Sequence, residues 1–233
     1  MIELSRIALI TVLALAGPLA QAQSSCSSDG QPQPAALLER FINADCESCW
    51  ADAKTPLPKA GEVALDWIVP GSMGDDAPLS AAANRDALLR LQALHRIPLP
   101  HADSVKTSAG AGQPKIRVAH GLPFSGYLGA SIEMKPARAG AWSAWLLLVE
   151  TIPAGTEGSS TERNLIRNVL QPAWNGPGQL SKMERPRFFE SRPMSVPQGA
   201  MPDRLRVIGW VEDARGRIGA IAQSRCAPAA PGG

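Results

Sequence analysis

Four cysteines constrain the fold of this chain more than any other feature of its sequence. Cys26 and Cys226 stand near the two ends, whereas Cys46 and Cys49 are separated by only two residues. Four cysteines allow three pairings, and the spacing favours Cys46 with Cys49 and Cys26 with Cys226. The second of these disulfides would close most of the chain into a single loop.

The two expected disulfides differ in how much they can stabilise a fold. Closing the loop between Cys26 and Cys226 contributes on the order of 5 kcal/mol at best, because it removes much of the entropy of the unfolded chain. The small ring of Cys46 and Cys49 contributes only about 2 kcal/mol before strain. We therefore predict a structural disulfide between Cys26 and Cys226, and a chemical role for Cys46 and Cys49.

The beginning of the chain has the pattern of a secretory signal peptide. A short first segment is followed by an apolar run over residues 7–16 and by a small-residue cleavage site at Ala20-Gln21-Ala22. The apolar run is shorter than the roughly 20 residues that a membrane span requires. We expect residues 1–22 to be removed, leaving a periplasmic or secreted protein without a membrane span. Such oxidising compartments favour disulfides.

The charge and the aromatic content of the chain argue against a nucleic-acid partner. The formal net charge is +2, and the chain has no basic run and only one Tyr and four Phe. Sites for nucleic acids combine clustered cations with stacking aromatic residues. We therefore predict no nucleic-acid partner, and we expect a protein or small-molecule thiol or disulfide instead. The sequence leaves the oligomeric state open.

The hydrophobic pattern predicts an α/β fold in one domain over residues 35–226. The Ser/Gln/Pro-rich residues 23–34 are expected to be a flexible arm and residues 227–233 a disordered tail. Within the domain, the first segments alternate as strand, helix, strand and helix, which is the pattern of an α/β unit. These segments are residues 37–42, 47–54, 62–69 and 84–95.

From about residue 115 the expected elements are strands. They cover residues 115–120, 127–134, 141–152, 205–211 and 217–223, the last two forming a hairpin. We expect this β-rich second half to continue the first sheet or to pack beside it. The tryptophans of the expected strands should lie in the core, as should Trp50 next to Cys49; the strand tryptophans are Trp67, Trp142, Trp145 and Trp210.

The Cys46-Glu47-Ser48-Cys49 motif is typical of thiol–disulfide exchange. At the start of a helix, free backbone N–H groups and the helix dipole stabilise a thiolate, so Cys46 would attack and Cys49 would resolve. Asp45 and Glu47 oppose this effect, because negative neighbours disfavour a second anion. A mildly reducing or an inert disulfide therefore fits better than a strongly oxidising one.

Two other functions remain open from the sequence. The protein could be a non-enzymatic envelope binding protein whose two disulfides are both structural. It could also carry copper on the two cysteines and one histidine, or carry zinc, but zinc needs two more ligands and no two of the three imidazoles are paired at ligand spacing. These imidazoles are His95, His101 and His120. We predict no cofactor and no resident metal site.

Other catalytic motifs are absent. The glycines of residues 108–112 precede an expected strand rather than a helix, so they do not form a dinucleotide loop. The segment Phe124-Ser125-Gly126 lacks the glycine two residues before the serine that a nucleophile elbow requires. Ser159 and Glu162 have the spacing of a helix cap.

The residues around the two close cysteines resemble a known family. Glu39, Phe41, Cys46 and Cys49 have the spacing found at the start of the secreted bacterial family known as domain of unknown function 1223. Three later segments are also similar to that family: residues 145–150, 162–170 and 204–223. The resemblance covers roughly residues 37–226. It implies a thioredoxin-like fold with a β-rich extension and places the candidate site at Cys46 and Cys49, while the family itself has no settled activity.

The chain departs from the family in two places. Trp50 replaces the proline that usually follows the second cysteine. The Thr-Pro segment that places a cis-proline beside the disulfide in thioredoxin-like folds has no clear counterpart, and Pro98, Pro100 and Pro123 are the candidates.

Overall fold

The computed structural model describes residues 26–98, 100–110, 114–135, 140–174 and 187–226. The predicted signal peptide and the predicted tail lie outside the described residues. Part of the predicted arm is described, and Cys26–Ser27 of that arm forms strand β1. No helix in the described ranges combines the length and the apolar character that crossing a bilayer demands.

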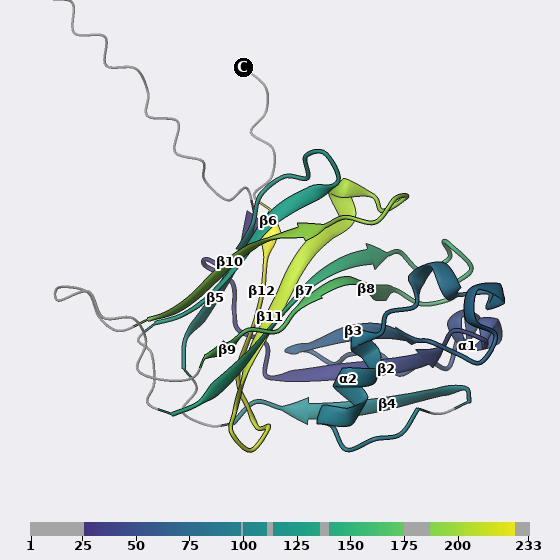
Figure 1. Ribbon diagram of the computed structural model, residues 1–233, viewed down its shortest axis with the longest axis horizontal. Coiled ribbons are helices and arrows are strands. Elements are labelled where there is room, and N and C mark those ends of the chain that lie inside the picture. The colour runs from purple at the N-terminus through teal and green to yellow at the C-terminus, as the bar shows by residue number, and fades with distance from the viewer. Residues whose placement is uncertain (1–25, 99, 111–113, 136–139, 175–186, 227–233) are drawn as a thin grey trace, which may run out of the picture.

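Two β-sheets form the body of the molecule (Figure 1). The large sheet contains, in spatial order, β12 (Ile218–Gln223), β11 (Leu205–Asp213), β7 (Trp142–Ile152), β8 (Arg163–Leu170), β3 (Glu62–Val69), β2 (Ala36–Asn43) and β4 (Ala102–Ser108), and β9 (Ala173–Trp174) pairs with β7. The small sheet contains β10 (Phe188–Ser195), β6 (Tyr127–Met134), β5 (Ile116–His120), β1 and β13 (Arg225–Cys226).

The described helices are short. They are α1 (Glu47–Ala51) and α2 (Asp86–Ala93), together with the 3-10 turns Gly74–Asp76, Ser80–Ala82 and Pro202–Arg204. Strand β2 pairs in parallel with β3, as the connection through α1 requires, and β3 makes one parallel bridge to β8. The other strand pairs are antiparallel.

The prediction of an α/β thioredoxin-like core is wrong. Strands hold 48% and helices 12% of the described residues, and the strands form two sheets. The four elements expected between residues 37 and 95 are present as β2, α1, β3 and α2. Strands from the second half continue the first sheet, which is one of the two expected arrangements, but a second sheet rather than helices covers part of it. Local periodicity identifies strands but not the layer that packs on them.

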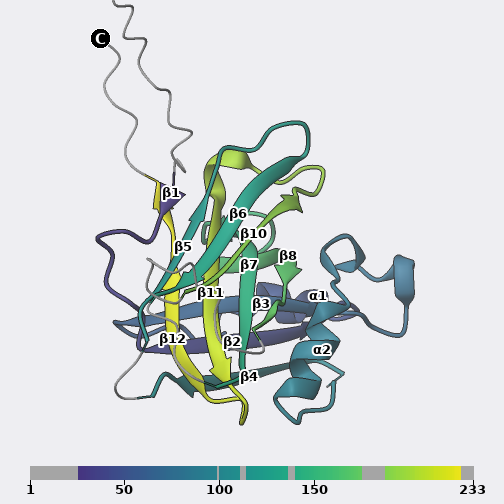
Figure 2. The ribbon, with the colours of Figure 1, turned by 60° about the vertical axis from the view of Figure 1, so that its left-hand side comes forward.

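The two faces of the large sheet are covered differently. Alternate residues of a strand point to opposite faces, so Phe41 of β2 packs with Leu91 of α2, while the next residue, Ile42, packs with Trp50 of α1. Figure 1 shows α2 crossing in front of β2 and β3. Figure 2 shows both helices near β2 and β3, at the end of the large sheet away from the small sheet.

The small sheet packs on the part of the large sheet formed by β7, β11 and β12. Val118 and Ile132 from the small sheet meet Leu146 and Val207 from the large sheet in one apolar cluster. A Cβ at Gly209 of β11 would lie 2.9 Å from side-chain carbons of both Val118 and Ile132. The glycine therefore allows the two layers to approach closely.

Four of the tryptophans predicted to be in the core are buried. Trp67, Trp145 and Trp210 are 0–1% exposed and Trp50 is 7% exposed, which confirms the prediction for these four. Trp142 is only half-buried. The indole of Trp145 stacks on that of Trp210 and meets that of Trp67 edge-on.

A buried ion triad lies among these rings. The guanidinium of Arg90 in α2 binds both carboxylate oxygens of Glu39 in β2, at 2.7 and 2.8 Å, and one of Glu212 in β11, at 2.6 Å. Trp145 and Trp210 donate to Glu212, and the Arg90 guanidinium lies 5.1 and 4.9 Å from their ring centroids. Burial opposes the charge of Arg90, but the two carboxylates outweigh it and raise its pKa. The triad fastens α2 to both halves of the large sheet.

Replacing Arg90 with Met should destabilise the fold by about 3–5 kcal/mol, because two buried carboxyl groups lose their cation. Replacing Arg217, which is 71% exposed in its pair with Asp213, should cost less than about 1 kcal/mol. Urea denaturation of both variants measures the difference. An Arg90→Met variant as stable as Arg217→Met would contradict the triad's role.

Candidate functional site

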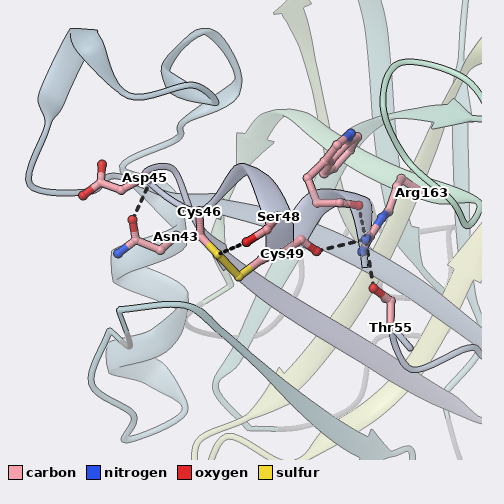
Figure 3. Close-up of a disulfide and its surroundings, with 8 residues drawn as sticks. Asn43, Asp45, Cys46, Ser48, Cys49, Thr55 and Arg163 are labelled. Carbon is pink, nitrogen blue, oxygen red and sulfur yellow. Dashed lines mark hydrogen bonds between the residues drawn. A yellow bond between two sulfur atoms is a disulfide. The ribbon is translucent and has the colours of Figure 1, made fainter. Parts of the chain in front are cut away.

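The disulfide between Cys46 and Cys49 lies at the connection between the end of β2 and the start of α1 (Figure 3). Cys46 is the N-cap residue of α1, and the backbone N–H of Cys49 donates to the Cys46 carbonyl at 3.1 Å. Both cysteines are half-buried. The hydroxyl oxygen of Ser48 lies 3.6 Å from the Cys46 sulfur, close enough for a hydrogen bond to sulfur.

Asn43 and Asp45 shape the turn that presents Cys46. The Asn43 side-chain oxygen accepts the Asp45 N–H at 2.8 Å, and the Asn43 carbonyl accepts the Cys46 N–H at 2.9 Å. The Asp45 carboxylate accepts the N–H and hydroxyl of Ser72 and the N–H of Met73. Desolvation opposes ionisation of Asp45, but these hydrogen bonds outweigh it and lower its pKa.

The Asp45 carboxylate is directed away from the disulfide, as Figure 3 shows. A Cβ at Gly71 would lie 2.1 Å from an Asp45 carboxylate oxygen, so only glycine lets the loop close around this side chain. The carboxylate of Asp45, next to Cys46 in the sequence, is therefore hydrogen-bonded to the neighbouring loop that contains Ser72 and Met73. Its expected effect on a Cys46 thiolate is weakened by this arrangement.

His101 is the residue that the tertiary structure adds to the two cysteines. It directly precedes β4, and an imidazole nitrogen and both sulfurs lie within 4.8 Å of one another. Its carbonyl accepts the Asn43 N–H at 2.8 Å, and β4 then runs antiparallel to β2. The sequence does not show which histidine lies beside the two cysteines, because the 52-residue separation of His101 from Cys49 hides a contact that strand pairing creates.

Arg163, the first residue of β8, fixes the far end of α1. Its guanidinium donates to the carbonyls of Cys49 and Trp50, at 3.3 and 2.5 Å, and to the Thr55 hydroxyl at 2.9 Å. It also lies 5.0 Å from the centroid of the Trp50 ring. Carbonyls at a helix C-terminus have no partner within the helix, and Arg163 supplies one. Burial lowers the pKa of Arg163, although Asp66 acts in the opposite direction.

Asp66 of β3 connects this clamp to Arg40 of β2. Its carboxylate accepts from Arg40 at 2.5 Å, from Arg163 at 3.2 Å and from the N–H of Asn164 at 2.6 Å. Arg40 and Asp66 are direct partners in the parallel pairing of β2 with β3. The sequence indicates that Arg40 and Asp66 need partners, because each lies within an apolar strand segment and buried charges are paired.

A cleft of about 400 Å³ opens beside the disulfide. Its lining includes Cys49, His101, Arg40 and Arg163. The exposed residue Asp52 also contributes to the lining. The cleft gives a partner access to the region of the disulfide, next to two guanidinium groups.

The second disulfide joins Cys26 of β1 to Cys226 of β13, which lie opposite each other in the small sheet. The pairing of all four cysteines is thus the one that their spacing favours. His120 of β5 is buried next to this bridge, and its Nδ1 lies 2.9 Å from the Gly121 carbonyl. Burial lowers the pKa of His120 despite that hydrogen bond.

Other residues singled out in the sequence take different places. Ser159 does not begin a helix, since β8 follows it, and its hydroxyl instead binds the Thr161 carbonyl and Arg163. Pro100 directly precedes His101 and so lies close to the disulfide, whereas Pro123 lies in the connection between β5 and β6 of the small sheet.

Comparison with protein-family models, with curated proteins and with solved structures finds no match for this chain. The resemblance to domain of unknown function 1223 therefore stays a prediction.

The stability of the fold should decrease as the pH falls from about 7 to 5. The folded state lowers the pKa of His120, so the unfolded chain, with a histidine pKa of about 6.5, binds the proton more readily. His120→Gln should flatten this dependence. Urea denaturation at several pH values measures it, with His95→Gln, at an exposed position, as the control. An unchanged slope in His120→Gln would exclude His120 as its source.

Proposed function

We propose that the protein catalyses thiol–disulfide exchange at Cys46 and Cys49 with a protein or small-molecule thiol or disulfide. The observation that carries the proposal is the position of this disulfide beside an open cleft, with an imidazole close to both sulfurs. A disulfide of such a small ring contributes little as a staple. Its accessible position suits chemistry better.

In the reducing direction, Cys46 loses its proton and its thiolate attacks a partner disulfide, forming a mixed disulfide and releasing one partner thiolate, which takes up a proton. Cys49 then loses its proton and attacks the Cys46 sulfur of the mixed disulfide. This step closes the Cys46–Cys49 bond and releases the second partner thiol. Two electrons and two protons pass in total from the cysteines to the partner. The reverse sequence oxidises a partner dithiol, and the compartment sets the direction.

Three groups support Cys46 as the attacking thiol. It occupies the N-cap of α1, and the Ser48 hydroxyl can donate to its sulfur. His101 can stabilise a thiolate as a cation or transfer a proton to the departing one. Asp45 opposes the anion less than its sequence position suggests, because Ser72 and Met73 bind its carboxylate.

A second candidate function is that of a non-enzymatic binding protein with two structural disulfides. The contact of Arg163 with the Cys49 carbonyl favours it, because this contact makes the disulfide part of a packed region. The two disulfides by themselves are consistent with this alternative.

Cys49→Ala should accumulate a mixed disulfide with a partner, because no resolving thiol remains, whereas Cys46→Ala should accumulate much less. Non-reducing electrophoresis followed by mass spectrometry measures both. The parent protein should also accelerate the reduction of insulin by dithiothreitol, and Cys46→Ser/Cys49→Ser should not.

The reduction potential of the Cys46–Cys49 couple separates the two functions. A working centre should lie above about −300 mV, and a structural bridge below it. A bridge that resists dithiothreitol in the folded protein, with no trapped adduct in either single variant, would favour the binding protein.

A further inference from the structure

Three side chains from two segments, residues 46–49 and the residue just before β4, converge at the edge of the large sheet. The sulfurs of Cys46 and Cys49 and an imidazole nitrogen of His101 all lie within 4.8 Å of one another. Thiolate and imidazole bonds to a first-row metal ion are about 2.0–2.3 Å long, so two donors of one ion lie at most about 4.6 Å apart. Small side-chain rotations therefore bring all three donors onto one ion once the S–S bond is broken.

The backbone holds the three donors in this arrangement. The Asn43 carbonyl accepts the Cys46 N–H, and the Asn43 N–H donates to the His101 carbonyl. One residue at the end of β2 thus fixes the position of the first cysteine and of the histidine. Arg163 fixes the other end of the motif through the Cys49 carbonyl. A ligand set attached to a rigid frame loses little entropy when it binds.

We propose that the reduced protein binds one monovalent copper ion through Cys46, Cys49 and His101. Soft thiolate ligands select Cu(I) among the common biological metal ions, and imidazole is also a copper ligand. Structural zinc sites are tetrahedral with four protein ligands, whereas the cluster in the described part of the chain supplies three. The donor set therefore favours copper over zinc.

The charges around the site are compatible with this ion. Two thiolates, one Cu(I) and a neutral imidazole carry a net charge of −1. On the cleft side, the buried guanidinium groups of Arg40 and Arg163 share the single carboxylate of Asp66. Together, Arg40, Asp66 and Arg163 therefore carry one net positive charge. This charge lies next to the Cys49 end of the motif.

Copper binding and the disulfide exclude each other, because the same sulfurs serve in both. A phosphine reductant and one water convert the disulfide into two thiols and the phosphine into its oxide. Binding of Cu(I) then releases the two thiol protons and changes no oxidation state. Formation of the disulfide by an oxidant would release the ion, so the oxidation state of the two cysteines controls whether copper is held.

The test uses protein reduced with a phosphine without oxygen, freed of excess reductant and titrated with Cu(I) against the coloured chelator bicinchoninate. We expect one Cu(I) per reduced chain and none at this site in the oxidised chain. His101→Asn should weaken binding at least roughly tenfold, since loss of an outer-shell partner alone costs 10–100-fold. His95→Asn, at an exposed histidine in the turn after α2, should bind like the parent.

X-ray absorption of the copper complex should show sulfur and nitrogen donors, with the nitrogen lost in His101→Asn. Equal affinity of His101→Asn and the parent would overturn the proposal. So would one Cu(I) retained by Cys46→Ser/Cys49→Ser, a disulfide that yields no thiols to the phosphine, or tighter binding of Zn²⁺ than of Cu(I) at the same residues. The exchange assays are carried out on metal-free protein, so either function can fail without the other.

Discussion

Two adjacent charges in the middle of β2 connect the large sheet to the helices α1 and α2. Glu39 and Arg40 point to opposite faces because neighbouring strand residues alternate. On one face, Glu39 binds Arg90 and thereby fastens α2. On the other, Arg40 shares Asp66 with Arg163, and Arg163 holds the carbonyls of Cys49 and Trp50. Buried ion pairs of this kind contribute little net stability, but removal of one partner is costly. They therefore fix the arrangement of the layers more than they strengthen it.

The same network places the candidate site. Arg40 lines the cleft and pairs with Asp66, and Arg163 connects Asp66 to the segment that carries the disulfide. The turn at Asn43 aligns both Cys46 and His101. The chemistry of the site and the packing of the sheet thus depend on one set of contacts. This explains why a disulfide with little value as a staple occupies a rigid position.

The two disulfides lie in different parts of the molecule. The bond between Cys26 and Cys226 joins the short strands β1 and β13, and it closes the small sheet at an edge where only two residues pair on each strand. Few hydrogen bonds hold such short strands, and the covalent bond adds to them. The bond between Cys46 and Cys49 lies in the other half of the molecule, beside the open cleft.

The sequence by itself determined the cysteine pairing that the structure has, the elements β2, α1, β3 and α2, and strands such as β6 and β11. Spacing and periodicity are local properties, and these features depend on local properties. Only the tertiary structure decided that β7, β8 and β11 join the first sheet, that a second sheet replaces helices as a cover, and that His101 stands beside the cysteines. These outcomes depend on pairing between distant segments and on shared burial of charges such as Glu39 and Arg90. The residues adjacent in the sequence do not indicate which distant strands pair or which buried charges meet.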